Sequence, residues 1–161
     1  MKDAAKGAPK PFEPEFVAML RDLFENRIPF NRIVGLHIDT IAPDHVSGHI
    51  EMRPELIGSA LHQRLHGGVI SASLDAIAGL AVIAAIGARH MDEPPRARMQ
   101  RFTKIGTIDL RIDYLRPATG TRFTMASEVM RLGSRVASAR MSFSGADDRL
   151  LATGSAAYIV S

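Results

Sequence analysis

The stretch that decides the fold runs from residue 67 to residue 88 and reads GGVISASLDAIAGLAVIAAIGA. It is almost wholly apolar, and its length alone permits a transmembrane helix, since roughly 20 apolar residues span a bilayer. Asp75 interrupts it, however, and charges are rare in such spans. The stretch is also rich in Ala, Gly and Ser. A helix that is apolar all round in a soluble chain is buried on every side, so we predict a buried central helix and no membrane insertion.

Before this stretch the sequence predicts a helix and a hairpin. Residues 36–41 and 46–52 alternate apolar and polar side chains, which is typical of two strands, and Pro43-Asp44 supplies the turn. Residues 1–12 are polar and are expected to form a disordered leader, so the single domain spans residues 13–161. Within it, apolar residues recur at helical spacing over residues 13–26, and Pro29 is expected to end that helix; they are Phe16, Val17, Leu20, Leu23 and Phe24.

After the central helix comes a basic connector, residues 90–104, and then a series of predicted strands. Residues 108–114, 123–129, 137–143 and 150–160 alternate with a period of two, and the last two form a hairpin. In 108–114 the alternation places Ile108, Leu110, Ile112 and Tyr114 on the inner face. Because the strands group around one helix without βαβ alternation, the fold class is α+β. The sheet has to wrap the helix, since nothing else could cover it.

Composition narrows the function classes. With 161 residues and 46% hydrophobic content, the chain suits one packed domain. The sequence contains no cysteine, which excludes a disulfide framework, thiolate metal sites and a cysteine nucleophile. Its start lacks the apolar core of a signal peptide, so we expect a cytoplasmic protein. A net charge of +3 is too small to indicate nucleic-acid binding, and it is compatible with an acidic small-molecule substrate.

Two features of the central stretch point to chemistry. Gly67 and Gly68 leave backbone N–H groups approachable at the start of a helix, where the helix dipole favours an oxyanion. Alternatively, they only make a tight turn. An ionised Asp75 inside an apolar helix costs several kcal/mol unless it is partnered. It is therefore either a general base or nucleophile, or a structural carboxylate bonded to its neighbours.

The spacing of these two features predicts a dimer. Gly67 and Asp75 are eight residues apart, which is roughly 12 Å along one helix. One carbonyl group cannot reach both. If both act in catalysis, Gly67 of one subunit must face Asp75 of another across a two-fold axis. We therefore expect a homodimer with active sites at its interface, while the pairing of dimers into tetramers stays open.

Other motifs are weak or absent. His62 and His66 are four residues apart, a spacing that can share a metal, but no third ligand suggests itself, so we expect no metal. The sequence has no GxxxxGK, GxSxG or GxGxxG motif, which argues against a phosphate-binding loop, a nucleophile elbow and a dinucleotide site.

The stretch Leu65-His66-Gly67-Gly68 with Asp75 nine residues after the histidine resembles the HGG…D signature of PaaI-type hotdog-fold thioesterases. Residues 106–118, GTIDLRIDYLRPA, are similar to the third strand of that family and the turn after it. The final hairpin is also similar, and the resemblance covers about residues 30–160. It implies a hotdog fold, in which an antiparallel sheet wraps a long central helix, with an additional N-terminal helix here. It also implies hydrolysis of acyl-CoA without a cofactor.

The resemblance assigns catalytic roles residue by residue. Asp75 would be the general base for water, or the nucleophile that forms a mixed anhydride. Gly67 would donate its N–H to the thioester carbonyl, and His66 would orient the turn or the substrate. Thr107 matches a hydroxyl that holds the attacking water in some members. Alternation, however, puts Thr107 on the polar face of its strand, so only a twist or a strand end would bring it to the site.

The resemblance also suggests residues that contact the substrate. Ser59 or His62 stands where members often carry an Asn, and Gly68 continues the glycine turn. Arg116 and the turn Gly133-Ser134-Arg135 are candidates for CoA phosphate contacts, or else ordinary solvated charges. The basic residues of the connector either grip phosphates or form a mobile loop, and the loop is favoured; they are Arg96, Arg98, Arg101 and Lys104.

Two alternatives to acyl-CoA hydrolysis stay open. One is a non-catalytic acyl-CoA-binding or sensor protein, although such a protein would not need Asp75 in an apolar helix. The other is a thioesterase that acts on acyl carrier protein. The scarcity of aromatic residues favours a medium- or long-chain aliphatic acyl group, in a tunnel lined by Leu61, Ile70, Leu74 and the N-terminal helix.

Overall fold

The computed structural model describes residues 10–161. Most of the expected leader, residues 1–9, lies outside the described residues. Its last residue contradicts the expectation, because Phe12 is buried and its ring packs edge-on against Phe16 with the centroids 5.1 Å apart. The ordered domain therefore begins before residue 13.

One antiparallel six-stranded sheet forms most of the molecule, in the order β1-β2-β6-β7-β8-β5. All the predicted strands are present and paired as hairpins or neighbours. β1 and β5 are the two edge strands. The bounds are β1 His37–Ile41, β2 Val46–Glu51, β5 Gly106–Tyr114, β6 Arg122–Leu132, β7 Val136–Gly145 and β8 Leu150–Ile159.

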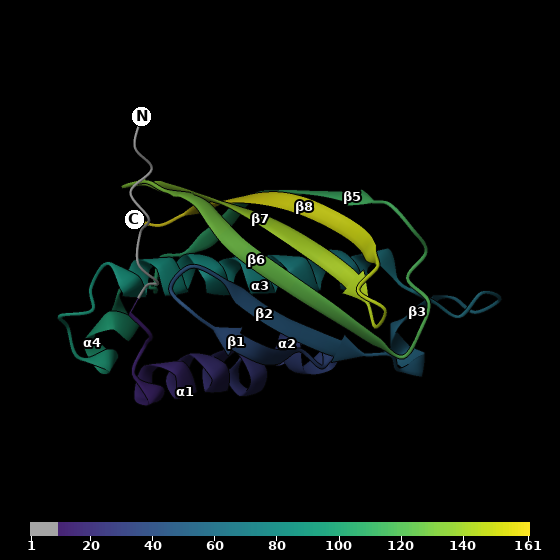
Figure 1. The fold of residues 1–161 in the computed structure, drawn as a ribbon, viewed down its shortest axis with the longest axis horizontal. Helices are drawn as coiled ribbons and strands as arrows, with labels where there is room; N and C mark the ends of the chain where they lie inside the picture. The colour runs from purple at the N-terminus through teal and green to yellow at the C-terminus, as the bar shows by residue number, and fades with distance from the viewer. Residues whose placement is uncertain (1–9) are drawn as a thin grey trace.

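The sheet curves around the central helix α3, Gly67–Ala88, which begins and ends where the sequence predicts (Figure 1). By length and composition α3 could cross a membrane, with a mean hydropathy of 2.2 over its most apolar window. Instead, 61% of that window is buried inside the domain. The inner face of the sheet carries many small side chains, such as Ala137, Ala139, Ala152 and Ala156, which let the strands approach the helix closely. The predicted α+β hotdog architecture is confirmed.

The N-terminal segment forms more than the one predicted helix. α1 spans Pro14–Asp22 and continues into a π-helical turn, η1, over Leu23–Arg27. A further helix, α2, spans Pro29–Val34. Pro29 therefore begins a helix, because proline is favoured at the first helical position, where its missing N–H is not needed. α1 lies against the C-terminal part of α3, where Gly87 makes room for Phe16: a Cβ at Gly87 would come within 2.8 Å of the ring.

The expectation that the connector after α3 is a mobile loop is wrong. Residues Pro95–Gln100 form the helix α4. Arg98 is fully buried, lies 4.1 Å over the Phe16 ring and is paired with Glu13. Arg101 is paired with Glu93. These two arginines are thus engaged within the protein, and the connector fastens the N-terminal segment to the domain.

A small hairpin precedes α3 and was not predicted. A short 3-10 turn, η2 at Pro54–Leu56, leads into β3, Ile57–Ser59, which pairs with β4, Arg64–Leu65. These strands are too short for any periodic pattern to show in the sequence. Their position matters because β4 runs directly into His66 and the start of α3.

The buried Arg98 provides a test of this packing. Replacing it in Arg98→Ala removes a desolvated cation over an aromatic ring, which is worth about 2 kcal/mol. We expect the melting temperature to fall by about 4–8 °C, measured by thermal unfolding. The control is Arg96→Ala, an exposed arginine on the same helix, which should change the melting temperature by little. Equal melting temperatures for the two variants would contradict the fastening role.

Candidate active site

His66 caps the N-terminus of α3. Its Nδ1 accepts a hydrogen bond from the Gly68 N–H at 2.9 Å. An Nδ1 that accepts carries no proton, so the ring proton lies on Nε2. A Cβ at Gly68 would lie 2.9 Å from the same Nδ1, so only glycine leaves room for this cap. His66 therefore holds the glycine turn at the start of α3.

The cap leaves one helix N–H unused. The Gly68 N–H is bonded to His66, whereas the Gly67 N–H meets no acceptor among the described residues. The Gly67 carbonyl accepts a hydrogen bond from the Tyr114 hydroxyl at 2.9 Å, which fixes the peptide plane. A free N–H at the positive end of a helix dipole is suited to an oxyanion. Gly67, rather than Gly68, is thus the available donor.

A cavity of about 500 Å³ opens at this end of α3. It brings together several of the expected residues: Ser59, His66, Gly67 and Arg116 all line it, and so do Arg64 and Tyr114. Arg116 donates to the Leu150 carbonyl at 2.9 Å and adds positive charge to the rim with Arg64. The cavity can therefore receive an anionic group beside the free N–H.

Two hydroxyl groups hold the Asp75 carboxylate. Asp75 Oδ1 accepts from the Thr107 Oγ1 at 3.0 Å and from the Tyr158 hydroxyl at 2.8 Å. The Tyr158 hydroxyl also lies 2.9 Å from the Asp75 carbonyl. Both donors meet Oδ1, and no described residue donates to Oδ2. The carboxylate is thus fixed in orientation with one oxygen left for chemistry.

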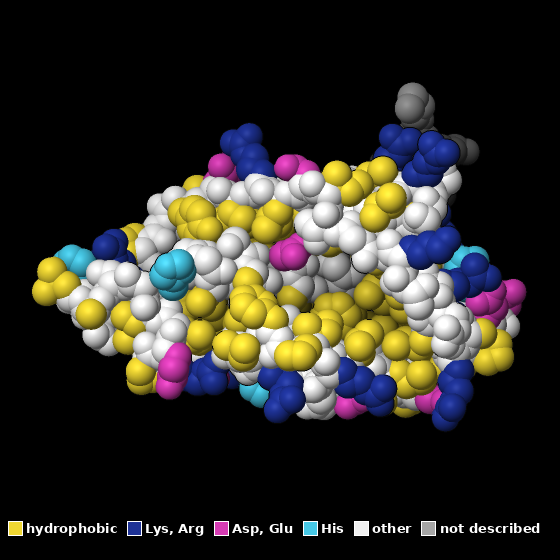
Figure 2. Space-filling view, turned by 180° about the vertical axis from the view of Figure 1, so that it is seen from behind, with side chains coloured by type: hydrophobic (Ala, Val, Ile, Leu, Met, Phe, Trp, Pro, Cys, Tyr) yellow, Lys and Arg dark blue, Asp and Glu magenta, His cyan; other side chains and the backbone are white. Residues whose placement is uncertain are grey.

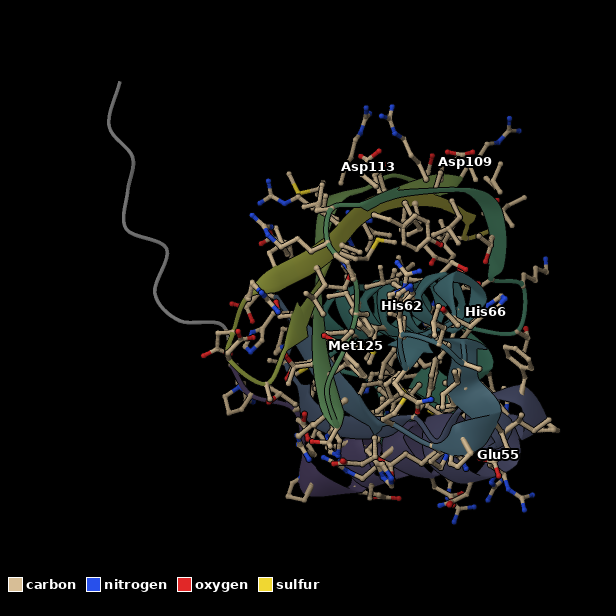
Figure 3. All side chains as sticks on the ribbon, turned by 90° about the vertical axis from the view of Figure 1, so that its right-hand side faces the viewer. Glu55, His62, His66, Asp109, Asp113 and Met125 are labelled. Carbon is tan, nitrogen blue, oxygen red and sulfur yellow. The ribbon has the colours of Figure 1, made fainter. Side chains whose placement is uncertain are left out.

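A β-bulge at Ile108 brings Thr107 to this site. The register of β5 against β8 shifts between Thr107 and Asp109, so Thr107 lies opposite the inward-facing Tyr158. Strict alternation would have turned Thr107 outward with Asp109, which Figure 3 shows on the outer side of the sheet with Asp113. Bulges re-aim side chains next to active sites in this way. The prediction that Ile108 faces inward is accordingly wrong, and its side chain is 57% exposed.

Sequence reasoning missed Tyr158. Burial, the Asp75 charge and the hydrogen bond to Asp75 together raise the pKa of Tyr158 well above its usual value. A signal was available, because Tyr158 continues the inward series of Ala152, Gly154 and Ala156 on the last strand. A buried tyrosine hydroxyl needs a hydrogen-bond partner. The only acidic group predicted inside the fold was Asp75.

Not every expected residue lines one of these cavities. His62 lies exposed in the β3–β4 turn and lines neither the cavity at Gly67 nor the surroundings of Asp75. Leu61, expected in the acyl tunnel, is 86% exposed in the same turn, and Leu74 faces the core. The turn Gly133-Ser134-Arg135 lies beside Arg89, at the opposite end of α3.

The two histidines do not form a metal site with their neighbours. His62 belongs to a turn and His66 to a helix cap, so their spacing of four does not place them on one helix face (Figure 3). Within residues 10–161 no group of three His, Asp or Glu side chains is arranged to hold a metal ion.

Three features together point to one class of protein: a carboxylate on a buried helix, a free backbone N–H at the start of that helix, and an antiparallel sheet wrapped around it. The thioesterase superfamily model matches residues 62–152, and the chain belongs to this superfamily. The match includes the helix cap, all of α3 and the strands β5, β6 and β7.

Two curated relatives are similar over most of the chain. The medium/long-chain acyl-CoA thioesterase YigI of Salmonella typhimurium is 36% identical over 142 residues, which cover 88% of this chain and 92% of that protein. YigI of Escherichia coli K12 is 34% identical over the same lengths. These relatives place the chain among thioester hydrolases.

Solved structures of related proteins have the same fold. A Shewanella oneidensis protein related to the thioesterase superfamily superimposes with a TM-score of 0.85 at 37% identity, covering 93% of this chain and 100% of that one. A thioesterase family protein from Silicibacter pomeroyi gives a TM-score of 0.71 at 25% identity, covering 89% and 96%. The hotdog fold therefore extends over nearly all of the chain.

The environment of Tyr158 generates a prediction on alkaline titration. The chain has two tyrosines, so Tyr114→Phe leaves Tyr158 as the only phenol. In the folded variant we expect phenolate absorbance to appear only above pH ~10, the ordinary value for tyrosine. The unfolded chain ionises Tyr158 near that value, so the free energy of unfolding should fall as the pH rises beyond it. Adding Asp75→Asn removes a negative charge and should lower the pKa of Tyr158. Ionisation of Tyr158 at its ordinary pKa in the folded protein would contradict the buried contact.

Proposed function

We propose that this chain is an acyl-CoA thioesterase acting on medium- or long-chain acyl groups, with Asp75 as the acting carboxylate. The observation that carries the proposal is the Asp75 side chain, with Oδ1 held by Thr107 and Tyr158 and Oδ2 free. The names of the YigI relatives support the substrate class. The absence of cysteine fits action in a reducing cytoplasm.

The proposed reaction uses the chain's own residues. Asp75 Oδ2 takes a proton from water as the water oxygen attacks the thioester carbonyl carbon. The carbonyl oxygen becomes an oxyanion that accepts from the Gly67 N–H. The C–S bond then breaks, the acid is released, and the CoA thiolate takes up the proton held by Asp75. In the other version, Oδ2 itself attacks the carbonyl carbon, the C–S bond breaks and the CoA thiolate leaves, giving a mixed anhydride. Water then cleaves the anhydride into the free acid and the Asp75 carboxyl group, whose proton passes to the thiolate.

The proposal requires two subunits at each site. Gly67 and Asp75 lie on one helix, roughly 12 Å apart along its axis. One thioester can meet both groups only if Gly67 comes from the partner subunit. β5 is a free sheet edge with exposed Ile108 and Tyr114, and an uncovered apolar edge favours pairing with a second copy. We therefore propose a homodimer whose interface builds the active sites.

The CoA moiety is assigned to the charged cavity. Arg64 and Arg116 lie at the mouth of the cavity that holds Gly67. The Gly133–Arg135 turn lies at the other end of α3. In an antiparallel pair of helices, that end of one subunit points toward the helix start of the other. The turn could then reach the nucleotide from the partner's side, as the family resemblance implies.

Asp75→Asn tests the proposal most simply. Because an amide cannot take the proton from water, we expect kcat to fall by about 10²–10⁴. The measurement is thiol release from a panel of acyl-CoAs of graded chain length. Asp109→Asn is the matched control, since it removes an exposed carboxylate on the outer face of the same strand that carries Thr107.

Two outcomes would count against the proposal. Full activity of Asp75→Asn would refute the role of the carboxylate. Tight acyl-CoA binding by the wild type without turnover would favour the non-catalytic binding protein instead.

A further inference from the structure

A second cavity lies beside Asp75, between the N-terminal segment and α3. Its volume is about 250 Å³. One wall comes from the end of the π-helical turn and α2, and the other from one face of α3. The lining residues are Phe24, Ile28, Phe30, Asn31, Ala72, Asp75 and Ala76.

The lining of this cavity is apolar except at one point. Asp75 is its only charged residue, and Asn31 is the only other polar one. The Asn31 amide donates to the Phe24 carbonyl at 3.0 Å, and its side chain is buried, so this amide is already engaged. The remaining walls are aromatic, aliphatic or methyl groups. Such a lining suits a hydrocarbon, and its described residues offer no cation for a phosphate.

Three features characterise the walls of this cavity. Ala72 and Ala76 lie one helical turn apart on α3, on either side of the Asp75 position, and their methyl groups leave space above the helix. The π-helical turn, braced by Asn31, holds Phe24 in place. Phe30 is 55% exposed, an unusual state for a large aromatic ring that nothing in the described chain covers. Figure 2 shows the face opposite that of Figure 1, where hydrophobic side chains form a broad band around a single acidic side chain.

We infer that this cavity is the subsite for the acyl chain, and that α2 and the π-helical turn set the preferred chain length. The inference rests on the proposed thioesterase function and locates the part of the active site that binds the acyl chain. The two cavities differ in charge: Arg64 and Arg116 are among the residues that line the one at Gly67, whereas no described cation lines the one at Asp75. A carbonyl carbon attacked at Asp75 would direct its apolar chain into the apolar cavity.

The N-terminal wall of this subsite lies outside the range that the superfamily model matches. The superfamily model matches residues 62–152, and the wall residues Phe24, Ile28 and Phe30 lie before that range. The volume is slightly below the 300–1,000 Å³ typical of whole-ligand pockets, as expected for a site that takes one part of a substrate. We expect kcat/KM to rise by about fourfold for each added methylene that is buried, and to level off once the cavity is full.

Two opposite substitutions test the assignment. Ala72→Leu fills the cavity from α3, and it should lower kcat/KM for the best long-chain acyl-CoA by at least about tenfold. It should change kcat/KM for a short chain such as butyryl-CoA by less than about threefold. Phe30→Ala removes the opposite wall and should flatten the gain in kcat/KM per methylene. Ile33→Ala is the matched control, because Ile33 is 66% exposed on the same helix but does not line the cavity.

The outcomes separate this inference from the proposed function. Selective loss of long-chain activity in Ala72→Leu, with the Ile33→Ala profile unchanged, supports the subsite. If the wild type hydrolyses acyl-CoA and Asp75→Asn does not, but Ala72→Leu and Phe30→Ala keep the wild-type profile, the subsite assignment is wrong and the function stands. If the wild type hydrolyses no acyl-CoA, both fail. Should Ala72→Leu not fold, as judged by its melting temperature, the Phe30→Ala profile alone decides.

Discussion

The helix α3 has to be covered along nearly its whole length, because an apolar helix left in water would lose the stabilisation that burial provides. The sheet meets this requirement by curving around it, with alanines on the inner face allowing close approach. The α1 helix covers the C-terminal part, where Gly87 accommodates Phe16. Buried Arg98 then ties the connector to α1 through Glu13. Asp75 lies on a face of α3 that is only partly buried.

The Asp75 carboxylate imposes a further constraint on the fold, in addition to the need to bury α3. A partly buried charge is costly unless hydrogen-bond donors surround it. The fold supplies Thr107 and Tyr158 from adjacent strands, and both bond to Oδ1. The bulge at Ile108 is what makes this possible, because it turns Thr107 inward opposite Tyr158. The same arrangement leaves Oδ2 without a donor among the described residues, and Asp75 lines the apolar cavity. The two hydrogen bonds to Oδ1 therefore both stabilise the charge of Asp75 and orient its carboxylate for the reaction.

The long apolar run was sufficient to predict α3, and alternation was sufficient to predict the long strands and the α+β class, because each pattern runs for many residues. It could not show the short hairpin β3–β4, whose strands span three and two residues. Nor could it place Thr107, since one inserted residue reverses every side chain beyond it. The helix α4 was missed because Arg98 reads as a surface charge until Phe12 and Phe16 are seen to stack on it. Tyr158 was overlooked although its strand alternation placed it inside.

The central claim is that each active site combines Gly67 of one subunit with Asp75 of the other, and mixed dimers test it most directly. Gly67→Pro deletes the N–H donor at the first helical position, where proline fits, and the extended His66 backbone (φ −65°, ψ 133°) accepts a following proline. Gly67→Pro and Asp75→Asn homodimers should each be nearly inactive. After the two are mixed and allowed to exchange subunits, the account predicts recovery to about a quarter of wild-type activity, since half of the dimers then hold one intact site. No recovery despite demonstrated subunit exchange would contradict it.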